Sequence, residues 1–253
     1  MMSPSTGQSA QGSFESSSPQ CSICAEIRGG PGRLYPDRLP GARFRSRTLW
    51  ECNEYWLVPS VGPLGPAHLM LVSRAHMPSL AGLQPSDLML AAYLLPALQA
   101  VVRGLSNYED AHVITFEHGS AGSNQQAGSC IDHCHLHIVG TPDVPSRPAG
   151  KWEPLPKLDS LLTAIGPNSP YLLFGCDNNL NWQPAPFRYP CQYLRRHVHS
   201  AMALLCDWDW MVDPRVDVMD TTIAEFERAH AERPIIAAYE EYSNKVAQAS
   251  DRE

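Results

Sequence analysis

The chain has 253 residues, with 26 acidic and 19 basic side chains, so its formal charge is −7 at neutral pH. This charge argues against a nucleic-acid partner, and 43% hydrophobic residues can form a real core, which excludes a wholly disordered chain. The amino terminus lacks the features of a signal peptide, and no apolar run approaches the roughly 18 residues that cross a bilayer. We expect a soluble cytoplasmic protein with no membrane partner, whose 8 Cys and 10 His are metal ligands or buried side chains.

The first half of the chain predicts strands around one helix. Residues 1–20 are Ser-rich and have too few large aliphatic side chains to fold, so we expect a disordered tail. The predicted strands are residues 55–58, 68–72, 112–117 and 131–139. Residues 86–105 have the length and composition of a helix, which Pro96 should kink or split. The last two strands, joined by a short loop, suggest an antiparallel pair, so we expect an α+β fold.

The second half is predicted to be mostly helical after a Pro-rich connection that ends near residue 156. The candidate helices are residues 193–205, 221–232 and 235–248. We therefore divide the chain into a tail (1–20), a catalytic domain (21–145) and a mostly helical extension (146–253). The extension could be a second small domain or a cover for one face of the sheet, and the sequence leaves both open.

Histidines alternate along the predicted strand at 131–139. Residues two apart on a strand point to the same face. One face would carry His133, His135 and His137, and the other Cys134, Leu136 and Ile138. Three imidazoles in one small area each need a polar partner, which a metal, a ligand or a substrate would supply.

Two chemistries use such a face of imidazoles. A metal hydrolase would take them as ligands. Alternatively, one neutral imidazole attacks a phosphorus atom while its neighbours hold the phosphate oxygens. The polar, Gly-rich residues 119–129 favour the second chemistry, because backbone N–H groups and glycines suit close approach to a phosphate.

Residues 133–139, His-Cys-His-Leu-His-Ile-Val, resemble the signature His-φ-His-φ-His-φ-φ (φ, apolar) of the histidine triad superfamily. Residues 21–24 are similar to the amino-terminal CxxC of its zinc-containing members. Residues 68–76 resemble a strand of the family and its trailing histidine. Residues 116–119 look like a segment of the galactose-1-phosphate uridylyltransferase branch, and dinucleoside polyphosphate phosphorylases are similar at a distance. The resemblance covers roughly residues 21–142 and implies an antiparallel sheet with packed helices.

The resemblance implies an enzyme, a nucleotide hydrolase or nucleotidyltransferase that acts on phosphoanhydrides or phosphoramidates. His135 would attack the α-phosphorus and carry a covalent nucleotidyl group, His137 would hold a phosphate oxygen, and His133 would support the site. Members of the family often form homodimers, which the resemblance therefore allows here.

The resemblance also implies a structural Zn²⁺. The ligands carried over are Cys21, Cys24, His76 and His133. They form a closed Cys2His2 set, which would attach the amino-terminal segment to the catalytic strand.

Candidate substrate contacts lie around this strand and at the start of a predicted helix in the extension. They are Glu117, Gln126, Gly128, Ser129, Cys130, Gln192, Arg195 and Arg196. An amide followed by two arginines suits a polyphosphate, since Arg pairs phosphate oxygens in a fixed fork.

Two departures from the family pattern bear on the substrate. Ser60 stands where the small hydrolases place the acidic residue that holds the ribose hydroxyls, and Leu136-His137 stands where the transferases have Gly-Gln. Uridylyl transfer to a sugar phosphate is therefore not favoured. Two alternative functions stay open: a metal-dependent hydrolase that uses the three strand histidines, and a catalytically weak nucleotide-binding or sensor protein.

Overall fold

The computed structural model describes residues 21–29, 39, 41–44, 46–121, 127–128, 131–166, 169–185, 189–202 and 206–250. The predicted tail at 1–20 lies outside these residues. So do three of the candidate substrate contacts, Gln126, Ser129 and Cys130.

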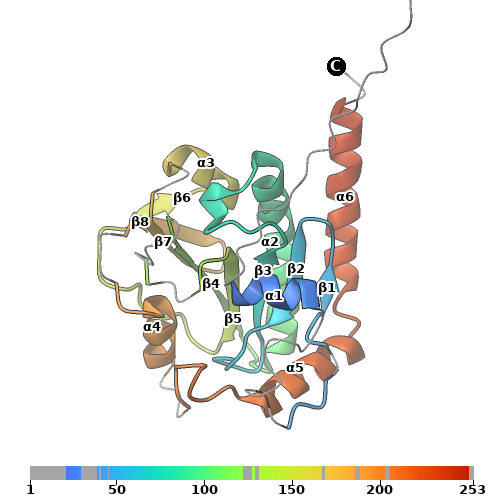
Figure 1. Cartoon of the computed structure of the whole chain (residues 1–253), viewed down its shortest axis with the longest axis vertical. Coiled ribbons are helices and arrows are strands. Elements are labelled where there is room, and N and C mark those ends of the chain that lie inside the picture. Colours follow the sequence, from blue (N-terminus) through green and yellow to red (C-terminus); the bar gives the residue numbers. More distant parts are fainter. Residues whose placement is uncertain are drawn as a thin grey trace, which may run out of the picture.

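Eight strands form one antiparallel sheet in the order β1-β2-β3-β5-β4-β7-β8-β6 (Figure 1). The strands are β1 (Trp50–Glu51), β2 (Tyr55–Pro59), β3 (His68–Ser73), β4 (His112–Gly119), β5 (His135–Thr141), β6 (Glu153–Leu155), β7 (Tyr171–Cys176) and β8 (Asn179–Pro184). The α+β class and the antiparallel pairing of β4 with β5 are confirmed.

Strand β5 begins at His135 and not at residue 131, which corrects the predicted strand. Just before it, the backbone N–H of Cys134 donates to the carbonyl of Met77, and the N–H of Ser73 donates to the carbonyl of Cys134. His133 therefore lies just ahead of the first ladder residue of the strand.

The helices are α1 (Ser22–Gly29), α2 (Pro85–Leu105), α3 (Leu161–Ala164), α4 (Tyr193–Ala201), α5 (Val216–Arg228) and α6 (Arg233–Ser250), with short 3-10 turns at Leu80–Gly82 and Leu158–Ser160. Helix α2 is not split at Pro96, which is exposed. By length and hydropathy α2 could cross a membrane, so the expectation that no stretch approaches a bilayer span is too strong. However, 56% of its apolar window is buried in the protein, as in the core helix of a globular fold.

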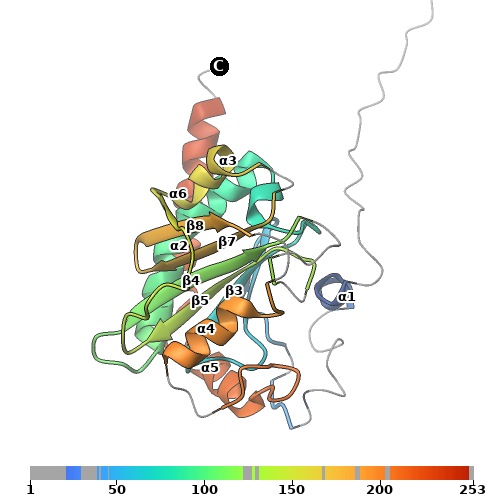
Figure 2. The same ribbon diagram turned by 90° about the vertical axis from the view of Figure 1, so that its left-hand side faces the viewer.

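Alternation along the strands separates the two faces of the sheet. One face packs Leu71, Leu136 and Ile138 against α2, which in turn contacts α6. Helices α1 and α4 lie on the other face (Figure 2). His135 pairs with Val72 and His137 with Met70 in the ladder to β3, so these two rings share the face that α1 and α4 cover.

The extension completes the sheet. Strand β7 pairs with β4 along six residues, and β8 and β6 follow at the edge. The 146–253 segment is therefore not a helical unit beside the sheet, as the predicted division implies, because three of its stretches are strands of that sheet. Its helix α4 covers the histidine face.

Candidate active site and metal centre

The four predicted metal ligands come together. Cys21, Cys24 and His133 are buried and His76 is half-buried, and their donor atoms lie within 4.8 Å of one another. Cys24 Sγ is 3.2 Å from His76 Nδ1 and 3.5 Å from His133 Nδ1, and the two Nδ1 atoms are 3.4 Å apart. A tetrahedron built on zinc–nitrogen bonds of about 2.0–2.1 Å and zinc–sulfur bonds of about 2.3 Å has edges of roughly 3.3–3.8 Å. The cluster therefore fits a tetrahedral metal ion.

A backbone carbonyl prepares His133 for this role. Its Nε2 lies 2.7 Å from the carbonyl oxygen of Ser73, so Nε2 carries the proton and donates. Nδ1 is then unprotonated and faces the sulfur atoms of Cys21 and Cys24. A second hydrogen bond of this kind fixes the tautomer and the orientation of a histidine that binds metal.

The three histidines of the motif do not form a metal site together. In the described part of the chain, the other group of three or more metal-binding side chains besides this cluster is His112, Cys176 and Asp177, whose carboxylate also pairs with Arg103. The ring of His133 contacts Cys21 and Cys24, which pack with Met70 and Val72 on the face of His135 and His137, while Cys134 packs into the α2 core. The alternation therefore extends back to His133, although the regular strand begins only at His135.

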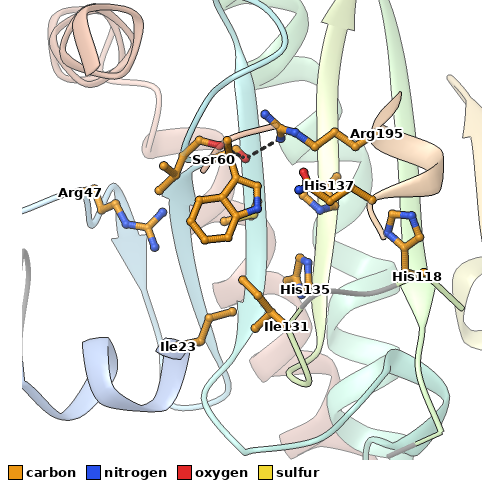
Figure 3. Close-up of a pocket in the computed structure, with 13 residues that line it drawn as sticks. Ile23, Arg47, Ser60, His118, Ile131, His135, His137 and Arg195 are labelled. Atoms are coloured by element: carbon orange, nitrogen blue, oxygen red, sulfur yellow. Dashed lines mark hydrogen bonds between the residues drawn. The ribbon is translucent and has the colours of Figure 1, made fainter. Parts of the chain in front are cut away.

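A cavity lies on the other side of β5 from the α2 core (Figure 3). Its lining is Ile23, Arg47, Ser60, Val61, Met70, His118, Gly128, Ile131, His135, His137, Gln192, Arg195 and Trp210. No Asp or Glu is among these residues. Arg47 is neutralised by Glu26, which accepts hydrogen bonds of 2.6 and 2.5 Å from it in a pair that is buried on both sides.

His135 presents an unprotonated nitrogen. Its Nδ1 lies 2.6 Å from the carbonyl oxygen of His133, and a carbonyl can only accept, so the proton of the neutral ring is on Nδ1. Burial lowers the pKa of His135 below its ordinary value and favours this neutral form. Nε2 therefore keeps its lone pair, and the ring lines the cavity.

His137 has the opposite tautomer, which two successive hydrogen bonds through His68 determine. The N–H of Leu64 donates to Nδ1 of His68 at 3.1 Å, so His68 is protonated on Nε2 and donates to Nδ1 of His137 at 2.9 Å. Burial lowers the pKa of both rings well below the ordinary value. The ring of Phe116 stacks on His137 at 4.4 Å and fixes its plane. The remaining proton of His137 is on Nε2, which can donate to a ligand.

His118 adds a third ring that the sequence analysis did not select. The N–H of Leu194, in the first turn of α4, donates to its Nε2 at 2.9 Å, so the proton is on Nδ1. Burial lowers the pKa of His118 to about 3, which keeps the ring neutral. Alternation with Phe116 along β4 could have placed His118 on the cavity face, since Phe116 pairs with His137.

Helix α4 brings two of the predicted substrate contacts to the cavity. Arg195 is 3% exposed and donates to the side chain of Ser60, to the carbonyl of Trp208 and to the carbonyl of Gly62. Gln192 is 5% exposed, and Gly128, a third predicted contact, accepts a hydrogen bond of 2.7 Å from its N–H. Ser60 lies at the cavity beside Arg195 although the two are 135 residues apart in the chain.

Two predicted contacts do not reach the cavity. Glu117 is 1% exposed on the α2 side of β4, where it accepts hydrogen bonds from the N–H of Leu80 and the hydroxyl of Tyr171. Its neighbours along the strand point to the cavity, so the alternation itself excludes Glu117. Arg196 is exposed, and its guanidinium lies 4.6 Å from the ring of Trp208. Arg196 directly follows Arg195 on α4, and the rotation of the helix between the two residues turns its side chain away from the cavity.

Residues from elsewhere in the chain complete the lining. Ile23 comes from α1, Arg47 from the segment before β1, and Trp210 from the loop before α5. No local pattern marks these side chains, because each reaches the cavity only through packing of its segment on the sheet.

No protein-family profile matches the sequence, but two bacterial proteins are similar to it. It is 26% identical over 105 residues to Protein HitA of Neisseria gonorrhoeae, covering 42% of this chain and 92% of the relative. It is 23% identical over 92 residues to an uncharacterized HIT-like protein of Chlamydia trachomatis, covering 36% of this chain and 78% of that protein. Both relatives carry the name of the histidine triad (HIT) proteins, so this chain is similar to proteins of that superfamily. The crystal structure of a histidine triad family protein of Bacillus anthracis is also similar, at 14% identity and a TM-score of 0.36, covering 49% of this chain and 74% of that chain.

The segments aligned with these relatives cover less than half of this chain. The motif residues divide between two sites: His133 belongs to the metal centre, while His135 and His137 line the cavity. Cys134 between them is buried against the α2 core, as the alternation predicts.

Proposed function

We propose that this protein is a nucleotide hydrolase or nucleotidyltransferase that acts at the α-phosphorus of a nucleotide anhydride or phosphoramidate, with His135 as the nucleophile. The observation that carries the proposal is the 2.6 Å hydrogen bond from His135 Nδ1 to the carbonyl of His133. It leaves an unprotonated Nε2 on a ring that lines a cavity whose described lining residues include no carboxylate. A neutral imidazole is nucleophilic without prior ionisation.

The reaction has two steps. Attack forms a bond between Nε2 of His135 and phosphorus, while the bond from phosphorus to the leaving oxygen or nitrogen breaks and its electron pair goes to the leaving group, which takes a proton from water. Water then attacks phosphorus and loses a proton to solvent. The phosphorus–Nε2 bond breaks, which restores the neutral ring and releases the nucleoside monophosphate. An acceptor in place of water gives transfer.

Preorganised donors stabilise the charge on the phosphoryl oxygens. The relay from His68 leaves Nε2–H of His137 for this purpose, and the bond from Leu194 leaves Nδ1–H of His118. These protons are already oriented before the substrate binds, so no reorganisation is needed when charge develops.

We propose that the Cys2His2 cluster holds zinc. Zinc at such a closed site supplies structural stabilisation, because four protein ligands leave no position for a substrate. Cys21 and Cys24 on the α1 segment would then be fixed to His133, next to the nucleophile. The carbonyl of His133 is the acceptor for His135, so the metal centre would position the nucleophile indirectly.

The test compares His135→Ala and His135→Asn with the wild-type protein, using a fluorogenic nucleoside phosphoramidate and a nucleotide anhydride. We expect both variants to lose turnover, and we expect mass spectrometry to detect a nucleotidyl adduct on the wild-type protein after rapid quenching. His230→Ala is the control, since this ring is exposed and outside the cavity. Full turnover in both His135 variants would refute the proposal.

Metal analysis separates the proposal from the metal hydrolase. One zinc per chain that survives His135→Ala and is lost in Cys21→Ser supports a structural metal. The opposite result supports metal-dependent hydrolysis. Tight nucleotide binding with no adduct and no product would instead support the binding or sensor protein.

A further inference from the structure

A second group of metal-binding side chains lies at the other end of β4 from the cavity. His112 is the first residue of β4, and Cys176 and Asp177 lie where β7 ends and the turn to β8 begins. Cys176 pairs with Ile114 across the two strands, so His112 is its diagonal neighbour on the same face of the sheet. His112 and His118 are six residues apart on one strand, which is about 20 Å, so this group is separate from the cavity.

The three donor atoms meet at one carboxylate oxygen. Oδ2 of Asp177 lies 2.9 Å from Nδ1 of His112 and 3.8 Å from Sγ of Cys176, and all three atoms lie within 4.8 Å of one another. Thiolate, imidazole and carboxylate are the groups that bind zinc in proteins. A tetrahedral zinc site has edges of roughly 3.3–3.8 Å, so shifts of about 0.5–1 Å would admit the ion.

The other oxygen of this carboxylate is held by the protein. Oδ1 accepts from Nη2 of Arg103 at 2.9 Å and from the N–H of Val113 at 3.1 Å. The backbone of Asp177 is also fixed, since its N–H donates to the carbonyl of Val113 at 2.7 Å and the amide of Gln99 donates to its carbonyl at 2.8 Å. Hydrogen bonds of this kind orient a carboxylate that binds metal. They leave Oδ2 to the two side chains that would share the ion.

Charge does not oppose a cation here, although Arg103 is close. A carboxylate oxygen accepts, so the His112 ring donates from Nδ1 and the Cys176 thiol donates from Sγ. A divalent ion replaces these two protons: the thiol proton leaves to solvent, and the ring proton moves to Nε2, which keeps the imidazole neutral. The ion, the thiolate and the carboxylate then sum to zero charge, so the Arg103 guanidinium faces no excess of positive charge.

The fourth position of a tetrahedral ion would face solvent. The side chains of His112 and Asp177 are 36% and 31% exposed, and Cys176 lines a hollow at the surface. Zinc sites with three protein ligands keep the fourth position for water. The buried Cys2His2 cluster has four protein ligands instead, so the exposed group should bind its ion more weakly and take it up from solution.

We propose that His112, Cys176 and Asp177 form a second metal site, which takes a divalent cation of the zinc type with water as the fourth ligand. The ion joins the first residue of β4 to the turn between β7 and β8, and it thereby attaches the extension to the strand that carries His118. The inference is independent of the reaction proposed for His135.

Cobalt titration distinguishes this site from the Cys2His2 cluster. Protein that retains one zinc per chain after dialysis is titrated with Co²⁺, because zinc is d¹⁰ and adds no visible absorption. We expect one Co²⁺ per chain to bind with the absorption of a tetrahedral ion and a thiolate-to-cobalt charge-transfer band. Calorimetry in two buffers of different ionisation enthalpy should show about one proton released per ion, as deprotonation of a thiol ligand requires.

Variants assign the band to the proposed ligands. Cys176→Ser should abolish the charge-transfer band, and His112→Gln should weaken cobalt binding by at least about tenfold. Cys206→Ser is the matched control, since this free thiol is half-buried and outside both clusters, and it should keep the band. Zinc retained in each variant shows that the fold is intact. No binding beyond the first zinc, or a band that persists in Cys176→Ser, would overturn the inference.

Discussion

Glu117 makes the stability of this protein depend on pH. Its carboxyl group is fully buried on the α2 side of the sheet, and burial raises its pKa from 4.5 to about 7, although the hydroxyl of Tyr171 and the N–H of Leu80 donate to it. The folded protein therefore keeps a proton that the unfolded chain releases from about pH 4.5 upwards. One pKa unit corresponds to about 1.4 kcal/mol, so the contribution of Glu117 to the free energy of unfolding falls by about 3 kcal/mol as the pH rises from 4 to 8.

The variant Glu117→Gln isolates this effect. The amide cannot ionise, its oxygen can still accept from Leu80, and all other titrating groups are shared with the wild-type protein. Urea unfolding followed by circular dichroism, at equal metal content and at several pH values from 4 to 8.5, gives both free energies. We expect the free energy of unfolding of the variant, relative to that of the wild-type protein, to rise by about 3 kcal/mol across this range, chiefly between pH 4.5 and 7. Parallel pH curves, or a variant that loses relative stability as the pH rises, would refute the burial argument.

Three further predictions concern stability and the metal. Glu26→Ala should cost about 3–5 kcal/mol in urea unfolding, because it removes the carboxylate from a buried ion pair with Arg47; a smaller loss than Arg47→Met alone would contradict this. Cys21→Ser should release the metal, seen by elemental analysis, and a chelator should lower the melting temperature of the wild-type protein but not of this variant. Gly119→Ala should destabilise by about 1–3 kcal/mol, since a Cβ there meets the Tyr171 ring, and an unchanged melting temperature would show that the ring can move.

The strands of the sheet differ in how well a local sequence pattern predicts them. The strand composition of residues 68–72 and 112–117 and the two-residue alternation from His135 to Val139 predict β3, β4 and one face of β5. The strands of the extension were harder to predict, because β7 and β8 lie between Pro-rich segments. Their place in the sheet depends on pairing with β4, which no feature of their own sequence specifies.

Glu117 and Arg196 are two side chains whose positions a local sequence pattern alone did not predict. Both are ionisable and lie next to cavity residues in sequence, yet one is turned into the core and the other to solvent. Alternation along β4 excludes Glu117 once the register with His137 is known. The orientation of α4 on the sheet buries Arg195 and leaves Arg196 exposed to solvent.

The sequence by itself determined the α+β class and the facing pair His135 and His137, because backbone geometry fixes the direction of side chains that are close in the chain. The Cys2His2 set was implied by the family resemblance. Only the tertiary structure decided that Ser73 fixes the tautomer of His133, that His68 sets the tautomer of His137, and that Arg195 meets Ser60. These contacts join segments from 60 to 135 residues apart. Whether they form depends on how helices and loops pack on the sheet, and that packing is a property of the whole core rather than of any local stretch.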